Sequence, residues 1–420
     1  MSKNEEKRIS RAMCEVHDAN DSIRACRDRF DLPEHTIYLD GNSLGALPRR
    51  TPLRVNELLR NEWGESLIKS WNKHDWATFP QRVSMKLACL LGANASEVII
   101  ADSTSVNIFK LLAGALVLPD VESRRIIVSE RGNFPTDLYM VEGVNAMLSG
   151  KYTLRLVEAG DVEASLDHDV AVALITHVDY CTGRQHNMAR LNKRASQTGT
   201  HIIWDLSHSA GAVELELNAD GAEMAVGCGY KYLNGGPGAP AFLYLAKALQ
   251  SNFATPLSGW FGHQMTFAFS PTYVPAAGIE RLLCGTPPVI ALAALECGID
   301  TFDGVNMDTI GKKSRALSEL FLALMRQECG NHHLESVSPS AENARGSHIS
   351  LAHEHAYPIM QALIDRGVIG DFRPPNLLRF GFAPLYTRFV DCYDAVIQLR
   401  DVMANEEWKA EKYQTRNRVT

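Results

Sequence analysis

The middle of this chain of 420 residues alternates short apolar runs with helical patterns, and this alternation constrains the fold more than any other feature. The runs are rich in valine, isoleucine and leucine: Glu97–Ala101, Arg125–Val128, Thr153–Val157, Ala171–Thr176, Ile202–Asp205, Glu223–Val226 and Ala241–Leu245. Strands that are apolar on both faces need cover on both faces, and the intervening helices supply that cover. The sequence therefore predicts an α/β domain with a mostly parallel sheet over about residues 60 to 290.

A second, smaller unit is expected beyond Pro287 and Pro288. Its predicted elements are helices over Val289–Phe302 and Ile310–Glu328, a β/α region with Ser347–Ala352, Tyr357–Arg366 and Leu378–Phe382, and a terminal helix from Arg388 to about Lys409. We predict that residues 56–290 form the large domain and residues 291–420 the small domain. Residues 1–55 are expected to join the small domain.

Charge and hydropathy exclude several classes of protein. The chain carries 42 Lys+Arg against 49 Asp+Glu and has no basic stripe, so we expect no nucleic-acid partner and no binding to an anionic membrane. Its apolar runs are far shorter than the roughly 18 residues that span a bilayer. Met1–Arg11 is charged and lacks the apolar core of a secretory signal.

The nine cysteines are scattered, and none forms a C-x-x-C pair. A disulfide framework or a zinc site is therefore not expected, and we predict no metal site. Reduced thiols in the cytoplasm are the better interpretation. We expect a cytoplasmic protein that is large enough to bury a cofactor.

Two residues that follow predicted strands carry the strongest chemical signal. Asp205 ends an apolar strand, at the edge where open α/β sheets bind ligands, although a helix N-cap would explain it equally well. Lys231 follows 26 residues later among glycines and has no acidic neighbour. A lone lysine is usually a solvated surface group, but a desolvated one has a lowered pKa and can form an imine.

Together these residues match the needs of pyridoxal phosphate, in which a lysine forms a Schiff base and an aspartate keeps the pyridine nitrogen protonated. Asp102–Ser105, at a predicted helix start, offers N–H groups and hydroxyls for a phosphate, although simple capping is the alternative. In Asn133–Asp137, Phe134 is suited to stack on a planar ring and Asp137 to hydrogen-bond near it. The alternative is an ordinary loop before a helix with proline in its first turn.

Several longer motifs carry a family resemblance. They are Tyr38–Gly45 (YLDGNSLG), Thr104–Asn107, Phe134–Asp137, Asp205–Gly211, Gly229–Tyr232, Gly235–Pro240, Gly259–His263 (GWFGH), Gly285–Pro288 and Arg379. With these motifs the chain resembles the kynureninase family, which belongs to the fold-type I pyridoxal-phosphate enzymes in the branch shared with cysteine desulfurases. The resemblance implies a seven-stranded type of large-domain sheet, a smaller α+β domain and a homodimer with shared active sites.

The resemblance also implies an activity, the hydrolysis of L-kynurenine to anthranilate and L-alanine in tryptophan catabolism and NAD biosynthesis, with 3-hydroxykynurenine as a second candidate substrate. The catalytic residues would be Lys231, which binds the cofactor and moves a proton at the substrate α-carbon, Asp205, and Tyr230 as a candidate acid/base relay. The other cofactor contacts would come from Thr104, Ser105, Phe134, Asp137, Thr176 and His208, with Trp260 and Thr286 contributed by the partner subunit.

Arg379 lies in an apolar, β-like setting and is expected to clamp the substrate α-carboxylate. An ion pair with an acidic neighbour is the alternative, and we favour the clamp because the flanking residues offer no acid. Ser43, Trp71 and Phe261 would line the aryl side of the substrate, although core packing would also explain Trp71. Trp71 and Thr286 together match the pattern of bacterial enzymes that favour L-kynurenine.

Two other functions stay open. A cysteine desulfurase or an aminotransferase on the same fold is the nearest alternative, but Cys329 and Cys392 lie in helical patterns without the cationic setting that activates a thiol. The second is a binding protein that has lost its cofactor. The joint presence of Lys231, Asp205 and Arg379 argues against it.

Overall fold

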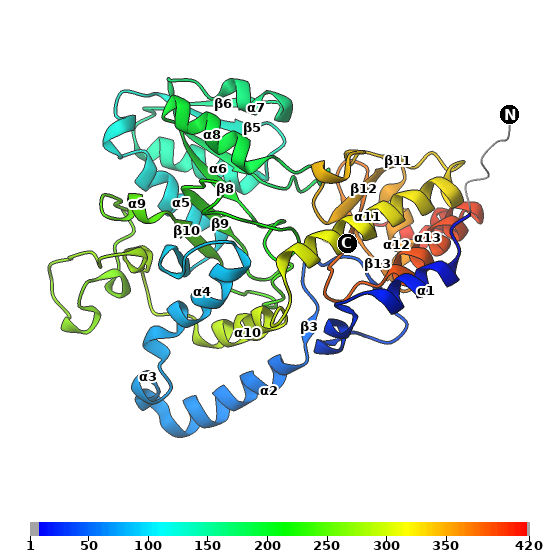
Figure 1. The fold of residues 1–420 in the computed structure, drawn as a ribbon, viewed down its shortest axis with the longest axis horizontal. Helices are drawn as coiled ribbons and strands as arrows, with labels where there is room; N and C mark the ends of the chain where they lie inside the picture. Colours follow the sequence, from blue (N-terminus) through cyan, green and yellow to red (C-terminus); the bar gives the residue numbers. More distant parts are fainter. Residues whose placement is uncertain (1–7, 418–420) are drawn as a thin grey trace.

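The computed structural model describes residues 8–417, so most of the charged N-terminal stretch for which no secretory signal is expected lies outside the described residues. The chain folds into a large α/β domain and a smaller domain beside it (Figure 1). No helix within residues 8–417 is long and apolar enough to cross a membrane.

The large domain is built on a seven-stranded sheet. Its strands follow the order β4 (Val98–Ile100), β10 (Phe242–Leu245), β9 (Met224–Gly227), β8 (His201–Asp205), β7 (Val170–Thr176), β5 (Ile126–Glu130) and β6 (Thr153–Val157). Only β10 runs against its neighbours, and all other pairs are parallel. The predicted α/β fold with a mostly parallel sheet is confirmed.

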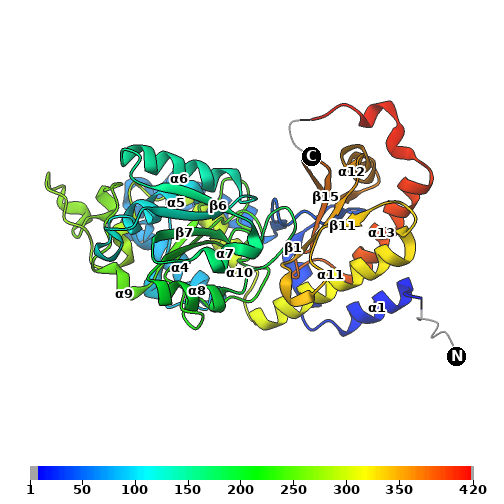
Figure 2. The same ribbon diagram turned by 90° about the horizontal axis from the view of Figure 1, so that it is seen from above.

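Helices cover both faces of this sheet, as the doubly apolar strands require. On one face lie α5 (Thr104–Ala115) and α6 (Pro135–Met147), and on the other α4 (Phe79–Leu90), α8 (Met188–Thr198) and α10 (Val289–Asp300), as Figure 2 shows. Along β8, Ile203 packs into the core on the α5 and α6 face, whereas Ile202 and Trp204 pack into the core on the α4, α8 and α10 face. The short helices α7 (Val162–Ser165) and α9 (Lys247–Gln250) follow β6 and β10.

The small domain has an antiparallel four-stranded sheet backed by helices. Its strands follow the order β11 (Glu335–Ser336), β12 (His348–Ala352), β15 (Leu377–Gly381) and β14 (Asp371–Arg373), and its helices are α11 (Met307–Cys329), α12 (Ala356–Asp365) and α13 (Phe389–Ala404). The predicted terminal helix ends five residues early. Asn405 caps it, and Glu406 adopts a left-handed conformation with φ of 52°.

The N-terminal segment packs on the small domain. Helix α1 (Arg11–Asn20) lies along α13, and the Asp18 carboxylate accepts hydrogen bonds from Phe389 N at 2.7 Å and Val390 N at 3.0 Å, which caps α13. Strand β2 (Ile37–Tyr38) pairs with β13 (Val368–Ile369), and β1 (Phe30–Asp31) pairs with β3 (Leu47–Pro48). Among the described residues, α1 and β2 contact the small domain. The predicted assignment of residues 1–55 to that domain and the domain limits at 55 and 290 stay predictions.

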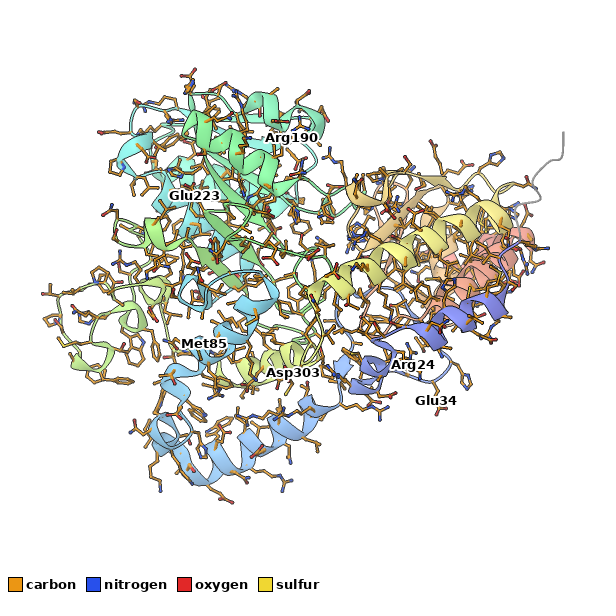
Figure 3. The ribbon with its side chains drawn as sticks, in the orientation of Figure 1. Arg24, Glu34, Met85, Arg190, Glu223 and Asp303 are labelled. Atoms are coloured by element: carbon orange, nitrogen blue, oxygen red, sulfur yellow. The ribbon has the colours of Figure 1, made fainter. Side chains whose placement is uncertain are left out.

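A helical arm and a hydrogen bond between the N-terminal segment and the residues after α10 complete the architecture. The arm consists of α2 (Arg50–Glu57), the π-helix Leu58–Ser66 and α3 (Ser70–Lys73), and it extends along the lower edge of the large domain in Figure 1. Figure 3 labels Asp303, whose carbonyl accepts a hydrogen bond from Arg29 of the N-terminal segment at 2.9 Å.

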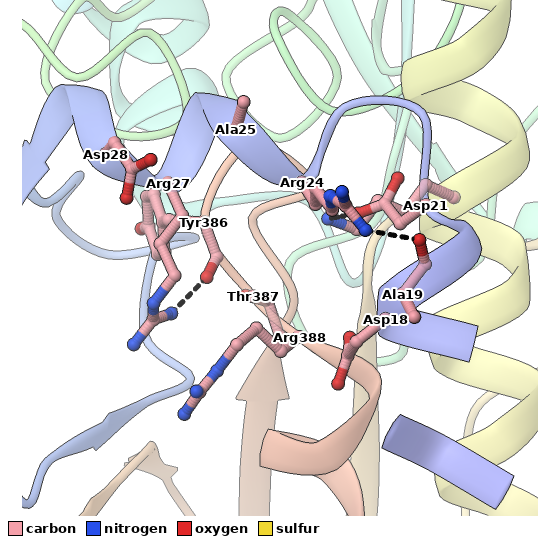
Figure 4. A pocket seen from close by; sticks show the side chains of 11 residues that line it. Asp18, Ala19, Asp21, Arg24, Ala25, Arg27, Asp28, Tyr386, Thr387 and Arg388 are labelled. Carbon is pink, nitrogen blue, oxygen red and sulfur yellow. Dashed lines mark hydrogen bonds and ion pairs between the residues drawn. The ribbon is translucent and has the colours of Figure 1, made fainter. Parts of the chain in front are cut away.

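A cavity of about 400 Å³ lies between the N-terminal segment and the loop before α13 (Figure 4). Arg24 donates to the carbonyl of Ala19 at 2.5 Å, and Arg27 donates to the carbonyl of Tyr386. Both guanidinium groups are thus engaged by the chain itself. The cavity is part of the seam that joins the N-terminal segment to the small domain.

Candidate active site

The topology brings the predicted residues to one edge of the large sheet. Strands β4, β5, β7, β8 and β9 all point the same way, so their carboxyl ends lie at the same edge. The residues at or just after these ends are Thr104, Asn133, Phe134, Thr176, Asp205 and Lys231. This is the edge at which open α/β sheets bind ligands.

Asp205 ends β8 and is buried. Its Oδ1 accepts hydrogen bonds from Ser207 N at 2.8 Å and Ser207 Oγ at 2.6 Å. Burial raises the pKa of Asp205, while the Ser207 hydrogen bonds and the charge of Lys231 oppose that rise. Because β8 runs into turns and not into a helix, the N-cap interpretation of Asp205 is wrong.

Lys231 lies in the turn after β9, with its Nζ 3.2 Å from His208 Nε2 and 6.0 Å from the centre of the Phe134 ring. Burial lowers the pKa of Lys231, and the positive charges of Arg379 and Arg373 lower it further, against the opposing charges of Cys228 and Asp205. Burial also lowers the pKa of His208 well below its usual value, so its imidazole is neutral. Lys231 is thus a desolvated amine and not a solvated surface lysine.

Asp137, in the first turn of α6, is a second buried carboxylate beside Asp205. Burial raises the pKa of Asp137 well above its usual value, and the negative charge of Asp205 raises it further. Its Oδ2 has no hydrogen-bond partner among the described residues. An orphaned buried acceptor next to a second carboxylate is costly unless a donor or a cation occupies the space between them.

The loop before α6 is held in place by Asn133. Its Oδ1 accepts hydrogen bonds from Phe134 N at 2.7 Å and from the Thr176 hydroxyl, and its Nδ2 donates to Ser129 Oγ at 3.1 Å. The Phe134 ring remains 42% exposed at the site. Thr176 therefore fixes the loop that presents Phe134.

The start of α5 has free hydroxyls. Ser103 is the N-cap, and its Oγ accepts from Val106 N at 3.4 Å, so Thr104 and Ser105 are not needed for capping. The Asp102 carboxylate is neutralised by the fully buried Lys110, with Nζ 2.5 Å from Oδ2. The first turn of a helix with spare hydroxyls and a neutralised acid suits an anion.

Arg379, on β15, is 1% exposed and makes the ion pair that was the alternative to the clamp. Its Nε donates to Asp371 Oδ1 at 2.8 Å and its Nη2 to Asp371 Oδ2 at 2.5 Å, while Nη1 donates to the carbonyl of Tyr180 at 2.6 Å. The residues that flank Arg379 in sequence offer no acid, but Asp371 faces it from the neighbouring strand β14, and the carboxylate clamp stays a prediction. The Tyr180 ring contacts the Phe134 ring at 5.2 Å, which places Arg379 beside the Lys231 site.

The YLDGNSLG motif links the two clusters. Ser43 Oγ donates to Asp371 Oδ2 at 2.6 Å, and Gly45 N donates to the carbonyl of Tyr230 at 2.8 Å. A Cβ at Gly45 would lie 2.4 Å from the carbonyl oxygen of Lys231, so this approach requires glycine. The Tyr230 ring lies 5.8 Å from Lys231 Nζ, and burial raises the pKa of its hydroxyl.

The remaining predicted residues form a second, aromatic cluster. The rings of Trp71 and Phe261 lie 5.9 Å apart, and those of Trp260 and Phe261 lie 4.6 Å apart. Trp71 and Thr286 line an apolar cavity of about 590 Å³ between the arm and α10. Within residues 8–417, these four residues make no hydrogen bond or ring contact with Lys231, Asp205 or Phe134.

The sequence did not single out several residues that shape the site. They are Asn42, Tyr180, His348, Asp371 and Arg373. Polar residues at alternate positions of Asp371-Phe372-Arg373, with Arg379 in the next apolar strand, form a pattern that indicates one shared polar face of a sheet. The long-range hydrogen bond between Arg379 and the carbonyl of Tyr180 leaves no such pattern.

Known proteins show close likeness to this chain. A family model described as the kynureninase C-terminal domain matches residues 310–399. The chain is 50% identical over 406 residues to a kynureninase from Burkholderia mallei (strain SAVP1), covering 96% of this chain and 98% of that protein. It is 47% identical over 410 residues to a kynureninase from Pseudomonas fluorescens, covering 97% of this chain and 99% of that protein.

Solved structures share the fold. The apo structure of a cysteine desulfurase from Thermococcus onnurineus NA1 has a TM-score of 0.77 at 17% identity, covering 90% of this chain and 98% of that chain. A C-DES variant with glycine covalently linked to its PLP cofactor has a TM-score of 0.77 at 15% identity, covering 89% and 99%. Such low identities speak for the fold alone. The identity to the two kynureninases, in contrast, extends over nearly the whole length of both chains, and the chain therefore belongs to the kynureninase family.

Proposed function

We propose that this chain binds pyridoxal phosphate and hydrolyses L-kynurenine to anthranilate and L-alanine. The observation that carries the proposal is the meeting of a desolvated lysine, two buried carboxylates and a buried arginine at one sheet edge. The residues fit the cofactor. The orphaned Oδ2 of Asp137 calls for a donor or cation such as a protonated ring nitrogen, and the spare hydroxyls at the start of α5 suit a phosphate.

When bound, pyridoxal phosphate supplies an electron sink for the charge that remains when a bond at the substrate α-carbon is broken. Lys231 would hold the cofactor and would move a proton at the substrate α-carbon. Its lowered pKa suits this task, because an amine must be neutral to accept a proton. Asp205 and Asp137 would keep the cofactor's ring nitrogen protonated, and Phe134 would stack on its ring. His208 orients Lys231 through their 3.2 Å contact.

Arg379 binds the substrate α-carboxylate, and Asp371 and Ser43 hold its guanidinium in place. Tyr230 is the candidate relay for the proton that moves when water adds to the substrate ketone. Thr104 and Ser105 hold the phosphate, and Thr176 fixes the loop that carries Phe134.

Anthranilate fluorescence on mixing the holoenzyme with L-kynurenine tests the function. We propose L-kynurenine over 3-hydroxykynurenine, because the apolar walls around Trp71 and Thr286 give the extra hydroxyl little to bond with. A holoenzyme that releases sulfur from L-cysteine and leaves L-kynurenine intact would favour the desulfurase alternative. The thiols near the site argue against that outcome, since burial raises the pKa of both Cys181 and Cys228.

We further propose a homodimer in the cytoplasm, with no nucleic-acid or membrane partner. Trp260 and Thr286 of the partner subunit would complete the phosphate site, and Trp71 and Phe261 would line the aryl side. Trp260 and Thr286 are exposed and, within residues 8–417, make no hydrogen bond or ring contact with Lys231, which supports a contribution across a subunit interface.

A complementation experiment tests the shared site. We expect Lys231→Ala and Trp260→Ala each to be nearly inactive alone, and their mixture, after subunit exchange, to recover about a quarter of wild-type activity. Half of the dimers would be mixed, and each would carry one intact site of two. Mixing Lys231→Ala with Asp205→Ala is the control and should recover nothing, since both residues belong to the same subunit's site. Recovery in the control, or none in the test mixture, would contradict the arrangement.

A further inference from the structure

A second guanidinium shares the polar face on which Arg379 lies. Strands β14 and β15 pair with Asp371 opposite Arg379 and Arg373 opposite Leu377. Side chains two residues apart in a strand point to the same side, so Asp371, Arg373 and Arg379 share one face of the small sheet. The opposite face carries Leu378 and Phe380, which pack into the domain core.

Within residues 8–417, Arg373 is held at this face through one nitrogen, Nη2. Its Nη2 lies 2.7 Å from Asp371 Oδ2 and donates to Ser43 Oγ at 3.1 Å. Its Nε is buried without a hydrogen-bond partner among the described residues. The side chain is 35% exposed, whereas that of Arg379 is 1% exposed. Arg373 is thus the outer and more accessible of the two cations.

The charges in this cluster do not balance. Two guanidinium groups share Asp371. Burial alone would raise the pKa of Asp371, but the charges of Arg379 and Arg373 and the hydrogen bond from Ser43 hold that pKa below its usual value. The second carboxyl is Asp40. Burial and the charge of Asp371 raise its pKa to about 7, so it is largely neutral below that pH. One positive charge then has no anion, which is the condition in which a site takes up a carboxylate.

The cluster lies beside the Lys231 site. Arg379 Nη1 donates to the carbonyl of Tyr180, the Tyr180 ring contacts the Phe134 ring at 5.2 Å, and the Phe134 ring centre lies 6.0 Å from Lys231 Nζ. The positive charges of Arg379 and Arg373 also lower the pKa of both Lys231 and His208. Arg373 also acts on Tyr230, whose ring lies beside Lys231 Nζ. An α-amino acid whose amine lies at Lys231 would therefore direct its carboxylate toward both guanidinium groups.

We propose that Arg373 is a second substrate-binding cation, which closes on the α-carboxylate from the solvent side while Arg379 holds it from the buried side, and that Asp371 is the positioning residue for both. The inference rests on the proposed function only in taking the substrate to be an α-amino acid. Arg379 supplies the rigid inner contact, and Arg373 supplies a contact that can open to admit the substrate. The competing explanation is that Arg373 is a structural partner of Asp371 and never touches substrate.

The test compares ligands with and without an α-carboxylate. L-kynurenine is paired with its decarboxylated amine, which keeps the aryl ketone, as a competitive inhibitor. We expect Arg373→Gln to raise the KM for L-kynurenine about tenfold with kcat changed less than about threefold, because one charge-assisted contact is lost. The inhibition constant of the decarboxylated amine should stay within about twofold, since that molecule has nothing for Arg373 to bind. A merely structural role would weaken both ligands alike, and that result would overturn the proposal.

Arg184→Gln is the matched control. Arg184 is 30% exposed and makes a single ion pair of 2.7 Å with the buried Glu130, so the change removes a similar contact outside the carboxylate cluster. We expect Arg184→Gln to leave the KM for L-kynurenine and the inhibition constant of the decarboxylated amine within about twofold of their wild-type values. Arg373→Lys is the second variant should Arg373→Gln fold poorly. Lysine keeps the positive charge but lacks the planar, bidentate guanidinium group. The KM of Arg373→Lys for L-kynurenine should therefore lie between the values of wild type and Arg373→Gln.

The two proposals fail separately. If the wild-type holoenzyme does not release anthranilate, the proposed function fails, and the Arg373 proposal is then decided by spectral titration of the holoenzyme with L-alanine and with ethylamine. The wild-type holoenzyme should bind L-alanine more tightly than ethylamine. Arg373→Gln should reduce the ratio of the ethylamine dissociation constant to the L-alanine dissociation constant about tenfold. An unchanged ratio would overturn the role of Arg373 whatever the reaction is.

Discussion

Lys231→Ala is expected to lower turnover of L-kynurenine by roughly 10⁴-fold or more and to remove the visible absorbance of lysine-bound pyridoxal phosphate. The amine it removes is the desolvated one at the centre of the site, 3.2 Å from His208 and facing Phe134. No second lysine among the described residues is in contact with His208 or Phe134, so none can replace it. Absorbance spectra and steady-state assays on the purified variant give both readouts.

Lys86→Ala is the control for losing a lysine elsewhere. Lys86 is 39% exposed and forms ion pairs with Glu296 and Asp300, which belong to α10. The control should keep its spectrum and its turnover, while the melting temperature of Lys231→Ala should stay near that of wild type. Near-normal turnover by Lys231→Ala would refute the assignment of this residue.

Asp205→Asn is expected to lower turnover by roughly 10³-fold with little loss of stability. Asparagine has the same shape and can still accept from Ser207 through its oxygen, so we expect about 1 kcal/mol or less of lost unfolding free energy. What it loses is the negative charge that would keep the cofactor ring nitrogen protonated. Parallel measurements of kcat and of the urea unfolding midpoint separate the two effects.

The charge of Asp205 also affects its neighbour. Because that charge contributes to the high pKa of Asp137, its removal should let Asp137 ionise more readily and partly replace it. The double variant Asp205→Asn/Asp137→Asn should therefore lose more activity than Asp205→Asn alone. Asp167→Asn, which removes a surface ion pair with Arg155, is the control and should be active. Retained turnover with an unchanged spectrum in Asp205→Asn would count against its role.

The fold of the large domain could be predicted from sequence because its information is local. Each strand is a short apolar run, and some of the helices between strands have a start signal of their own, as Ser103 shows before α5 and Asn187 before α8. The right-handed crossover rule then leaves few ways to arrange the strands. The reversed direction of β10 and the arm over residues 50–73 have no comparable local signal, since packing against distant elements decides them.

The site divides in the same way. Asp205, Lys231 and Thr104 could be singled out because each follows a predicted strand. The partner of Arg379 could not, because Asp371 lies across a strand pair and only the register between β14 and β15 brings them together. The residues next to Arg379 in sequence are apolar and include no acid. Closeness in sequence does not show closeness in space, and the acid that contacts Arg379 lies on the neighbouring strand.

The loop Gly41–Gly45 has a mechanical consequence. It is bonded at one point to the turn that carries the reactive amine, through Gly45 and Tyr230, and at another to the acid that orients both guanidinium groups, through Ser43. Any shift of Asp371 relative to the large sheet would therefore displace the loop and, through it, the turn that carries Lys231. The carboxylate-binding end of the site and its amine are thus coupled through only a few residues of chain.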